Sequence, residues 1–381
     1  MRDFLLLTGA TGQVGQYLLR DLLLAGQPLA VLVRGRGKHS AQDRLEKILD
    51  HWEGELHRRL PRPVYFEGDI TRPNCGLDRQ SRIWIANHCR AVFHNAASLT
   101  FVGADRAGDP WLTNVTGTRH VLDLCAETRV RHLHYVSTAY VCGTRSSVIY
   151  ENELDCGQDF RNDYEKSKFE AETQIRAAHL DSLTVYRPAI IVGDSQTGYT
   201  VTYHGPYTYM QFGCLLANFA EREPDGRWLL PVRLNLTGKE RRNLVPIDWV
   251  SAVMTHILHH PEYHNQTYHL TPVEPTNAQQ IEGAIAERLG YYGPTYVGPH
   301  GLDGQELNDC EKQFYETVLT YQPYWNEEPN FDLRNTMAVA PHLPCPKVDQ
   351  ALLLRLLDFG IADQWGKGRR TKRAVRTPAT V

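Results

Sequence analysis

The sequence has no apolar run near the roughly 18 residues that a membrane-spanning helix needs, so no transmembrane segment is expected. It also has little net charge. The formal value is −3 over 381 residues, which offers no general attraction to nucleic acid or to an acidic membrane. The short apolar start, FLLL, runs straight into glycines without a cleavage site. It therefore predicts a first strand rather than a signal peptide.

The eight cysteines form no C-x-x-C pair and show no metal-ligand spacing. Several lie in apolar surroundings, which is typical of reduced, buried thiols in a cytoplasmic protein. His256, His260 and His264 recur at helical spacing, but no thiolate or carboxylate spacing accompanies them. We expect these histidines to pack against neighbouring groups, and we expect no metal site.

Short apolar runs alternate with helical patterns through the first half of the chain. The runs are rich in Val, Ile, Leu and Tyr, and helical stretches such as 112–128 and 163–179 separate them. This alternation predicts an α/β fold whose parallel sheet is covered by helices on both faces. In such sheets the ligand binds beyond the carboxyl ends of the strands. The expected strands lie within residues 4–7, 29–35, 63–69, 90–98, 131–141 and 182–193.

A glycine-rich turn, TGATGQVG, follows the first strand and opens a helix. Its glycines allow a tight turn, close approach of the backbone to a pyrophosphate, and close packing of the helix on the strand. The helix N-terminus adds free N–H groups and a positive dipole end. The turn has one residue more between its first two glycines than G-x-G-x-x-G has. It predicts a dinucleotide site that includes Thr8, Gly9, Thr11, Gly12, Gln13, Val14 and Gly15.

The end of the second strand indicates which dinucleotide binds. An NAD site usually has an acidic residue there, which holds the ribose 2′-hydroxyl. Here Arg34 occupies the position, with Arg36 and Lys38 behind it. A guanidinium pairs well with a 2′-phosphate, so we predict NADP(H) with Arg34 as its contact. The alternative is that these residues are ordinary exposed loop cations.

Tyr164 and Lys168 are four residues apart in a helical pattern, FRNDYEKSKFEAE. One helical turn places their side chains on a common face. By itself the pair is a weak motif. Its meaning depends on the motifs elsewhere in the chain.

Taken in order, the motifs resemble the extended short-chain dehydrogenase/reductase superfamily. They are TGATGQVG, GDIT, HNAAS, TNVTGT, VSTAYVCG, the Tyr–Lys pair and RPAIIVG. Within the superfamily the chain is most similar to the thioester reductase and fatty acyl-CoA reductase branch, which is male-sterility-like. The stretches LVRGRGKHSAQDRLEKIL, HNAASLTF and RRNLVPIDWVSAV favour this branch. The resemblance implies a Rossmann-type, doubly wound parallel sheet with a smaller C-terminal substrate lobe.

The resemblance also implies roles for single positions. Thr138 stands at the position of the catalytic Ser or Thr, with Ser137 as the less favoured alternative, and Tyr164 and Lys168 match the catalytic pair. Asn114 matches a residue that is structural in the family. The positions implied to contact the cofactor, besides the glycine turn and Arg34, are Asp69, Ile70, Asn95, Ala96, Ala97, Tyr164, Lys168 and Pro188.

The spacing of the pair suits carbonyl reduction. A carbonyl needs hydride at carbon and a proton at oxygen, and a tyrosine with a pKa near 10 is a reluctant donor. We expect the Lys168 ammonium to lower the pKa of Tyr164 and to reach the nicotinamide ribose. The Thr138 hydroxyl would add a hydrogen bond to the substrate oxygen.

The resemblance therefore implies an NADPH-dependent oxidoreductase that reduces an acyl thioester, carried on CoA or an acyl carrier protein, or an aldehyde. Three alternatives remain open. The chain could be a sugar-nucleotide epimerase or dehydratase, a ketone or hydroxysteroid-type dehydrogenase, or a non-catalytic NADP-binding regulator. The intact Thr–Tyr–Lys set argues against the regulator.

The second half of the chain has a different texture. We expect an NADP-binding core over residues 1–193, with strands returning from about 240–270. A substrate-binding lobe interleaved with the core is expected over 194–290, and a mainly helical C-terminal extension over 291–365. The segment 366–381 is basic and predicted to be disordered; it either forms a solvated end or contacts an acidic partner or a membrane surface. The aromatic residues expected either to line an acyl pocket or to pack the lobe are Tyr199, Tyr203, Tyr207, Tyr209, Phe212 and Trp228.

Overall fold

The computed structural model describes residues 3–218 and 220–367, and within them the chain forms two compact units. Unit 1 comprises Met1–Ala189, Ile247–Thr271 and Asn330–Pro344. Unit 2 comprises Ile190–Pro246, Pro272–Pro329 and Cys345–Val381. The expected basic, disordered tail falls largely outside the described residues.

Unit 1 is built on a seven-stranded parallel sheet with the strand order β12-β6-β5-β4-β1-β2-β3. Strand β2, LAVLV, is buried along its whole length, and β1, β4, β5 and β6 are buried at all but one position each. Such continuous apolar runs suit a sheet that is covered on both faces. The strands are β1 (Phe4–Thr8), β2 (Leu29–Val33), β3 (Val64–Glu67), β4 (Cys89–His94), β5 (His132–Val136), β6 (Ser182–Pro188) and β12 (Thr267–Leu270).

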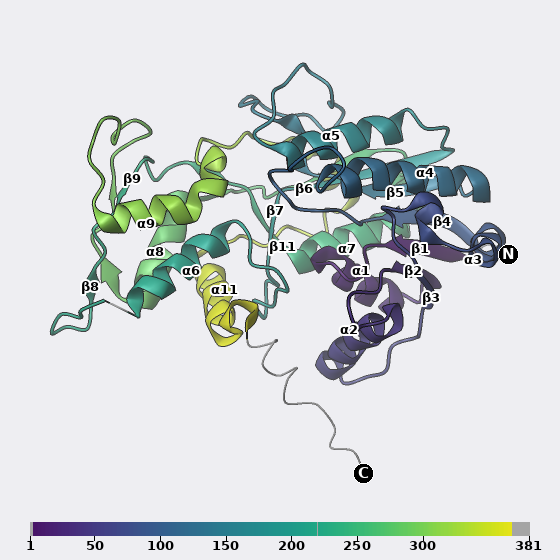
Figure 1. The fold of residues 1–381 in the computed structure, drawn as a ribbon, viewed down its shortest axis with the longest axis horizontal. Helices are drawn as coiled ribbons and strands as arrows, with labels where there is room; N and C mark the ends of the chain where they lie inside the picture. The colour runs from purple at the N-terminus through teal and green to yellow at the C-terminus, as the bar shows by residue number, and fades with distance from the viewer. Residues whose placement is uncertain (1–2, 219, 368–381) are drawn as a thin grey trace, which may run out of the picture. The chain divides into compact units, whose positions relative to one another are not determined.

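Helices cover both faces of this sheet. Helix α1 (Gln13–Leu24) packs against α2 (Ala41–Leu56) and α7 (Ile247–Leu258) on one face. On the other face α4 (Gly117–Thr128) packs against α3 (Arg79–His88) and α5 (Asp163–Arg176), and Figure 1 shows α4 and α5 on the side of the sheet opposite α1 and α7. The fold class predicted from the sequence is confirmed: unit 1 is a Rossmann-type, doubly wound α/β sheet.

The helix that carries the Tyr–Lys pair starts where its sequence predicts. Asn162 precedes α5, and its side chain accepts a hydrogen bond from Glu165 N at 3.0 Å. A capping amide of this kind satisfies one of the first N–H groups of a helix, which otherwise lack partners. Tyr164 is therefore in the first turn of α5, and Lys168 follows one turn later.

The apolar run at 182–193 carries two strands rather than one. Strand β6 ends at Pro188 in the sheet of unit 1, and β7 (Ile190–Val192) pairs with β11 (Leu244–Pro246) in unit 2. Proline has no N–H to donate to a ladder. The run thus leads the chain out of the dinucleotide-binding sheet.

Unit 2 is a helical and aromatic core with very short strand pairs. Its helices are α6 (Pro206–Ala217), α8 (Ala278–Leu289), α9 (Asp309–Val318) and α11 (Gln350–Ala362). Helix α11 buries Leu352, Leu353, Leu356 and Leu357, the apolar side that its sequence predicts. The remaining short pairs are β8 (Trp228–Leu229) with β14 (Tyr291–Tyr292), β9 (Arg233–Leu234) with β15 (Thr295–Tyr296), and β10 (Arg241–Arg242) with β13 (Thr276–Asn277).

The observed units divide the chain at different points from the expected 193, 290 and 365. Residues 247–271 supply α7 and β12 to unit 1 and lie within the stretch 194–290, which was expected to form a lobe interleaved with the core. The segment Asn330–Pro344 also belongs to unit 1. It contains α10 (Arg334–Val339), and the hydroxyl of Thr336 donates to His269 O on β12 at 2.8 Å. Helices α9 and α11 belong to unit 2, so the region 291–365 is not one separate extension.

No helix among the described residues is both long and apolar enough to cross a membrane. All eight cysteines are described, and none of them forms a disulfide: Cys75, Cys89, Cys125 and Cys142 are buried, Cys156 is exposed, and the rest are intermediate.

Candidate active site in unit 1

The glycine turn lies between β1 and α1 and leaves no room for side chains at two positions. Gly9 has a φ of +73°, and a Cβ there would come within 2.6 Å of Ala96 N. A Cβ on Gly15 would lie 2.0 Å from Gly9 O. Gly12 caps α1 without a side-chain hydrogen bond, and the first turn of the helix contains no acidic residue. The N-terminus of α1 therefore keeps N–H groups and a positive dipole end suited to a phosphate.

The ends of β1 and β4 are tied together beside this turn. The Thr8 hydroxyl is buried, pairs with His94 Nδ1 at 2.8 Å, and accepts from Asn95 N at 3.2 Å. The Asn95 side chain donates to Gly9 O at 3.2 Å. Thr8 and Asn95, both predicted as cofactor contacts, thus also fix the shape of the turn.

The other predicted cofactor positions have different exposures. Asp69 follows β3, and its carboxylate accepts from Thr71 N at 3.0 Å. Ile70 is 7% exposed and packs against the start of α4. Thr11, Gln13, Val14 and Ala96 are partly exposed, Ala97 is exposed, and Pro188 is buried. Residues 95–97 directly follow β4, and Pro188 ends β6, so these positions lie at the carboxyl ends of the strands.

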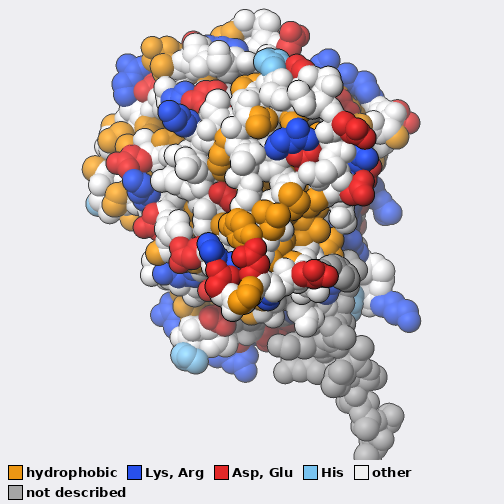
Figure 2. Space-filling view, turned by 90° about the vertical axis from the view of Figure 1, so that its left-hand side faces the viewer, with side chains coloured by type: hydrophobic (Ala, Val, Ile, Leu, Met, Phe, Trp, Pro, Cys, Tyr) orange, Lys and Arg blue, Asp and Glu red, His pale blue; other side chains and the backbone are white. Residues whose placement is uncertain are grey.

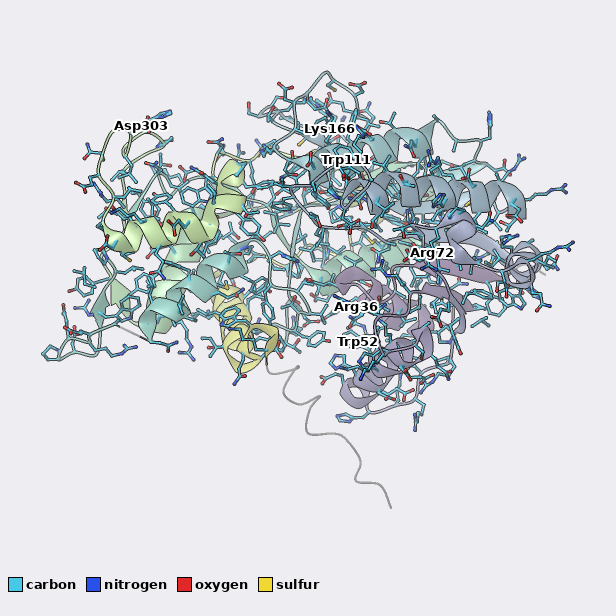
Figure 3. All side chains as sticks on the ribbon, viewed as in Figure 1. Arg36, Trp52, Arg72, Trp111, Lys166 and Asp303 are labelled. Carbon is cyan, nitrogen blue, oxygen red and sulfur yellow. The ribbon has the colours of Figure 1, made fainter. Side chains whose placement is uncertain are left out.

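Arg34 follows β2 directly and is mostly exposed, with a 3.3 Å ion pair to Asp69. Sequence reasoning missed a second arginine, Arg44 on α2. Its guanidinium donates to Thr11 Oγ1 at 2.9 Å and also to the backbone carbonyl of Arg34. Figure 3 labels Arg36 in the loop between β2 and α2, which joins these two arginines. The only signal for Arg44 in the sequence was its position in the helical pattern that follows RGRGK. Cations on a surface helix normally point into solvent, so this signal was weak.

Thr138 and Tyr164 are brought together by the end of β5 and the start of α5. The Thr138 hydroxyl acts on the Tyr164 phenol and opposes the rise of its pKa. Thr138 is 3% exposed, and its hydroxyl also donates to Pro188 O at 3.4 Å. Tyr164 is only partly buried. The neighbouring hydroxyl of Ser137 points elsewhere and donates to Glu172 Oε2 at 2.6 Å.

Lys168 is almost fully buried beneath the pair. Its Nζ donates to Val136 O at 2.8 Å and lies 4.3 Å from the centre of the Tyr135 ring. Burial lowers the pKa of Lys168 to about 7. The charge of Glu172 raises this pKa, but its effect is smaller than that of burial. The same ammonium also acts on His94. Burial, and to a smaller extent the charge of Lys168, lowers the pKa of His94 to about 3. The lysine therefore stands close to both the catalytic candidates and the strand ends of the glycine turn.

The expected lowering of the Tyr164 pKa is wrong. Burial raises the pKa of Tyr164 to about 12, although the hydrogen bond with Thr138 opposes the shift. Removal from water disfavours the phenolate, and the nearby charge of Glu165 raises the pKa of Tyr164 further. At neutral pH the phenol holds its proton, as a proton donor must.

Glu172 and Arg187 form a buried ion pair that sequence reasoning did not anticipate. Both side chains are 0% exposed, and Arg187 Nη2 lies 2.6 Å from Glu172 Oε1. Burial would raise the pKa of Glu172, but the charges of Arg187 and Arg176 hold it at about 2. Glu172 stands one turn after Lys168 on α5, so the pair supports the helix that carries the Tyr–Lys couple.

The loop after β4 holds an aromatic ring beside the tyrosine. The ring centres of Phe101 and Tyr164 are 6.0 Å apart. Asn114 bonds the loop through Ser98 N at 2.8 Å, and Asp163 accepts from Gly103 N at 2.8 Å. Both ends of the loop are therefore fixed. The Asn114 contacts agree with the structural role that the resemblance implies.

Other predicted groups serve packing. The rings of His256, His260 and His264 each bond a backbone carbonyl, such as Val339 O at 2.9 Å from His256 Nε2. Across the described residues, no group of three or more His, Cys, Asp and Glu side chains is placed to hold a metal ion. Of the six aromatics considered, Tyr207, Phe212 and Trp228 are buried in the core of unit 2, and Tyr209 and Phe212 line a cavity there.

Comparison with known proteins agrees with the motifs. A family model described as male sterility protein matches residues 7–254. The nonribosomal peptide synthetase asaC of Aspergillus flavus is 29% identical over 301 residues, which are 75% of this chain and 28% of that protein. The aldehyde reductase lnaA of the same species is 28% identical over 359 residues, 84% of this chain and 31% of that protein. The chain thus spans less than a third of the length of these relatives.

A solved structure is similar over nearly the whole chain. It is the terminal R domain from the myxalamid PKS-NRPS biosynthetic pathway, with a TM-score of 0.74 and 25% identity. The match covers 95% of this chain and 91% of that one. The similarity therefore extends over both units and is not confined to the seven-stranded sheet of unit 1.

Proposed function

Because the chain belongs to the male sterility protein family, we propose that it is an NADPH-dependent reductase of acyl thioesters. Its thioester substrate is held on CoA or on a carrier protein, and the product is the aldehyde. An aldehyde is the second substrate class, in line with the printed name of the relative lnaA.

The observation that carries the proposal is the grouping of Thr138, Tyr164 and Lys168 at the carboxyl ends of the strands of unit 1. They come from two elements, the turn after β5 and helix α5. A phenol that retains its proton, a second hydroxyl and a buried amine are the groups that carbonyl reduction needs.

The residues of the glycine turn fit a dinucleotide. The N-terminus of α1 has no side-chain cap and no acidic residue in its first turn, so a pyrophosphate meets free N–H groups and no negative charge. Arg34 and Arg44 supply positive charge at the end of β2, which favours the 2′-phosphate of NADPH over the 2′-hydroxyl of NADH. Bound NADPH supplies the hydride.

The chain's own groups manage the proton. Tyr164 donates its phenolic proton to the carbonyl oxygen as negative charge develops there, and the Thr138 hydroxyl donates a hydrogen bond to the same oxygen. The charged form of Lys168 stabilises the phenolate left behind. With a thioester, hydride at carbon and proton at oxygen give a hemithioacetal, which breaks its C–S bond to release the aldehyde and the thiol.

A carrier protein is the proposed source of the thioester. The relative asaC is named as a nonribosomal peptide synthetase, and the similar solved structure is named as a terminal R domain. A chain similar to such a terminal domain would act on the last thioester. CoA and pantetheine thioesters are the simpler stand-ins for the carrier arm.

The test is a substrate screen that follows the absorbance of the reduced nicotinamide. We expect NADPH to be consumed with hexanoyl-CoA, hexanoyl-pantetheine and hexanal, with an aldehyde trapped from the thioesters. UDP-glucose should leave NADPH untouched. Consumption with none of the thioesters or aldehydes, or turnover of the nucleotide sugar, would contradict the proposal.

Tyr164→Phe sharpens the test because it removes only the phenolic oxygen. We expect turnover to fall about 100- to 10,000-fold while NADPH binding, measured by fluorescence, is retained. Tyr65→Phe is the matched control, since Tyr65 lies on β3 and is 40% exposed. Full activity in Tyr164→Phe would contradict the assigned proton donor.

A further inference from the structure

Unit 2 contains an apolar cavity of about 100 Å³. Its walls come from α6, α8, α9 and the short strands between them. The wall residues include Phe212, Val232, Leu234, Ile281, Phe314 and Trp325. All six are buried, with exposures of 3–8%. The space is partly open, and it is larger than the few small voids that protein interiors normally contain.

Two polar residues of the wall, Trp325 and Arg242, are engaged with the protein. Trp325 Nε1 donates to Tyr209 Oη at 2.6 Å. The Arg242 guanidinium donates to three backbone carbonyls, those of Arg241, Asn326 and Trp325. The Tyr296 hydroxyl is buried without a hydrogen-bond partner, and most of the remaining wall is hydrocarbon and aromatic.

The charged groups of the wall do not favour an anionic occupant. Glu282 is the one acidic residue of the wall, and burial raises its pKa. A carboxylate or phosphate would find Arg242 already bonded to backbone carbonyls. Figure 2 shows a cluster of hydrophobic side chains with acidic side chains beside it.

We infer that this cavity is a binding site for a compact, uncharged aliphatic or aromatic group. An engineered cavity of about 150 Å³ lined by Leu, Ile and Phe stays dry and binds benzene, and this cavity is somewhat smaller with similar walls. Apolar walls and a few fixed polar groups are the usual features of a small-molecule pocket. The inference does not depend on the reductase activity, because it rests on unit 2 alone.

The group could be a separate small molecule or the acyl part of a substrate. The direct test uses toluene, 1-hexanol and hexanoate as probes of the full chain without NADPH. Trp325 lies in the wall, so its fluorescence should change on binding. We expect saturable changes with toluene and 1-hexanol, each with a raised melting temperature, and at least tenfold weaker binding of hexanoate, which differs from hexanol in its charge.

A filled cavity supplies the matched comparison. Ala278 and Ala286 both lie on α8 and are partly buried, but only Ala278 lines the cavity. Ala278→Leu should weaken both neutral probes at least tenfold, whereas Ala286→Leu should leave them unchanged. Ile281→Phe is a second filling variant in case Ala278→Leu does not fold, and a cooperative melt checks folding in each.

Competition distinguishes the two sources. If hexanoyl-pantetheine displaces toluene and Ala278→Leu raises its KM, the group is the substrate's acyl part. If hexanoyl-pantetheine does not displace toluene and Ala278→Leu does not change its KM, a separate apolar molecule is the natural ligand, and the inferred binding site is still supported. The inference is overturned if neither neutral probe binds the wild-type chain, or if filled and unfilled chains bind them equally.

Discussion

The two units treat buried charge differently. In unit 1 both partners of the Glu172–Arg187 pair are withdrawn from water, with 0% of each side chain exposed. In unit 2 the buried carboxylate of Glu311 pairs with Arg233, which remains 34% exposed. Unit 2 instead leaves an apolar space unfilled. Unit 1 therefore maintains a fixed polar interior beneath its catalytic candidates, and unit 2 maintains room for an uncharged group.

The largest expected effect comes from opening the buried pair. Glu172→Ala leaves the Arg187 guanidinium without its main counter-charge, and loss of one partner of a buried pair reduces the free energy of unfolding by about 3–5 kcal/mol. Urea denaturation of the cofactor-free protein measures it. Glu327→Ala is the control in unit 2, because its pair with Arg241 is solvent-accessible, with 47% of Glu327 and 30% of Arg241 exposed; about 1 kcal/mol or less is expected. Equal losses would remove the contrast between the units.

Lys168→Met should increase the free energy of unfolding, whereas Glu172→Ala should decrease it. The lysine has a pKa of about 7 in the folded protein against an ordinary 10.5. Between these values the unfolded chain holds a proton that the folded protein releases, so wild-type stability rises with pH. The variant lacks this slope. We expect it to exceed the wild type at pH 6 by a few kcal/mol at most, and the difference to shrink towards pH 10.5, while turnover is lost.

Lys166→Met controls for the loss of a lysine, because Lys166 is exposed on the same helix and is labelled in Figure 3. It should change neither turnover nor the pH slope. In the wild type, kcat/KM should fall as the pH rises through about 7, where the ammonium is lost. A pH profile of stability that is identical in wild type and Lys168→Met would show that the lysine is not held in this buried state.

Arg34→Ala and Arg44→Ala should each discriminate between cofactors. Loss of a charged hydrogen bond to the 2′-phosphate weakens NADPH about 10- to 100-fold, while NADH, which lacks that phosphate, changes little. Titration by nicotinamide fluorescence gives both constants. Lys38→Ala, in the same loop and exposed, is the control and should have the smaller effect. Equal losses of NADPH and NADH would show that the cofactor preference is set elsewhere.

The smallest expected effect belongs to unit 2. Ala278→Leu fills part of the cavity and keeps a strong helix former, so it should raise the free energy of unfolding by about 1 kcal/mol. Thermal melting measures the gain, and NADPH affinity should stay constant because the change lies in unit 2. A destabilised variant would mean that the cavity cannot accept a larger wall residue.

Sequence patterns predicted unit 1 well because its elements are long and regular. The βα alternation located its strands, and the glycine turn and α5 lie where their motifs place them. Unit 2 was harder. Pairs such as Tyr291–Tyr292 with Trp228–Leu229 have two residues each, which is too short for any alternation to be visible. The division of the run 182–193 was hidden as well, since both of its strands are apolar.

Electrostatic detail at the site also escaped the sequence. The Tyr–Lys spacing predicted a common face, but the direction of the Tyr164 pKa shift depends on burial, which spacing does not report. Arg44 approaches Thr11 only because α2 packs beside the turn. Glu172 is a carboxylate in a helix rich in charged residues, where an exposed position is the usual expectation.

The division of the chain into units has a consequence for how the protein can be made. The backbone passes from one unit to the other after residues 189, 246, 271, 329 and 344. During synthesis the sheet of unit 1 cannot gain its edge strand β12 until unit 2 is partly made. A simple truncation therefore yields neither unit whole, and exchanging unit 2 between relatives would require several simultaneous splices rather than one.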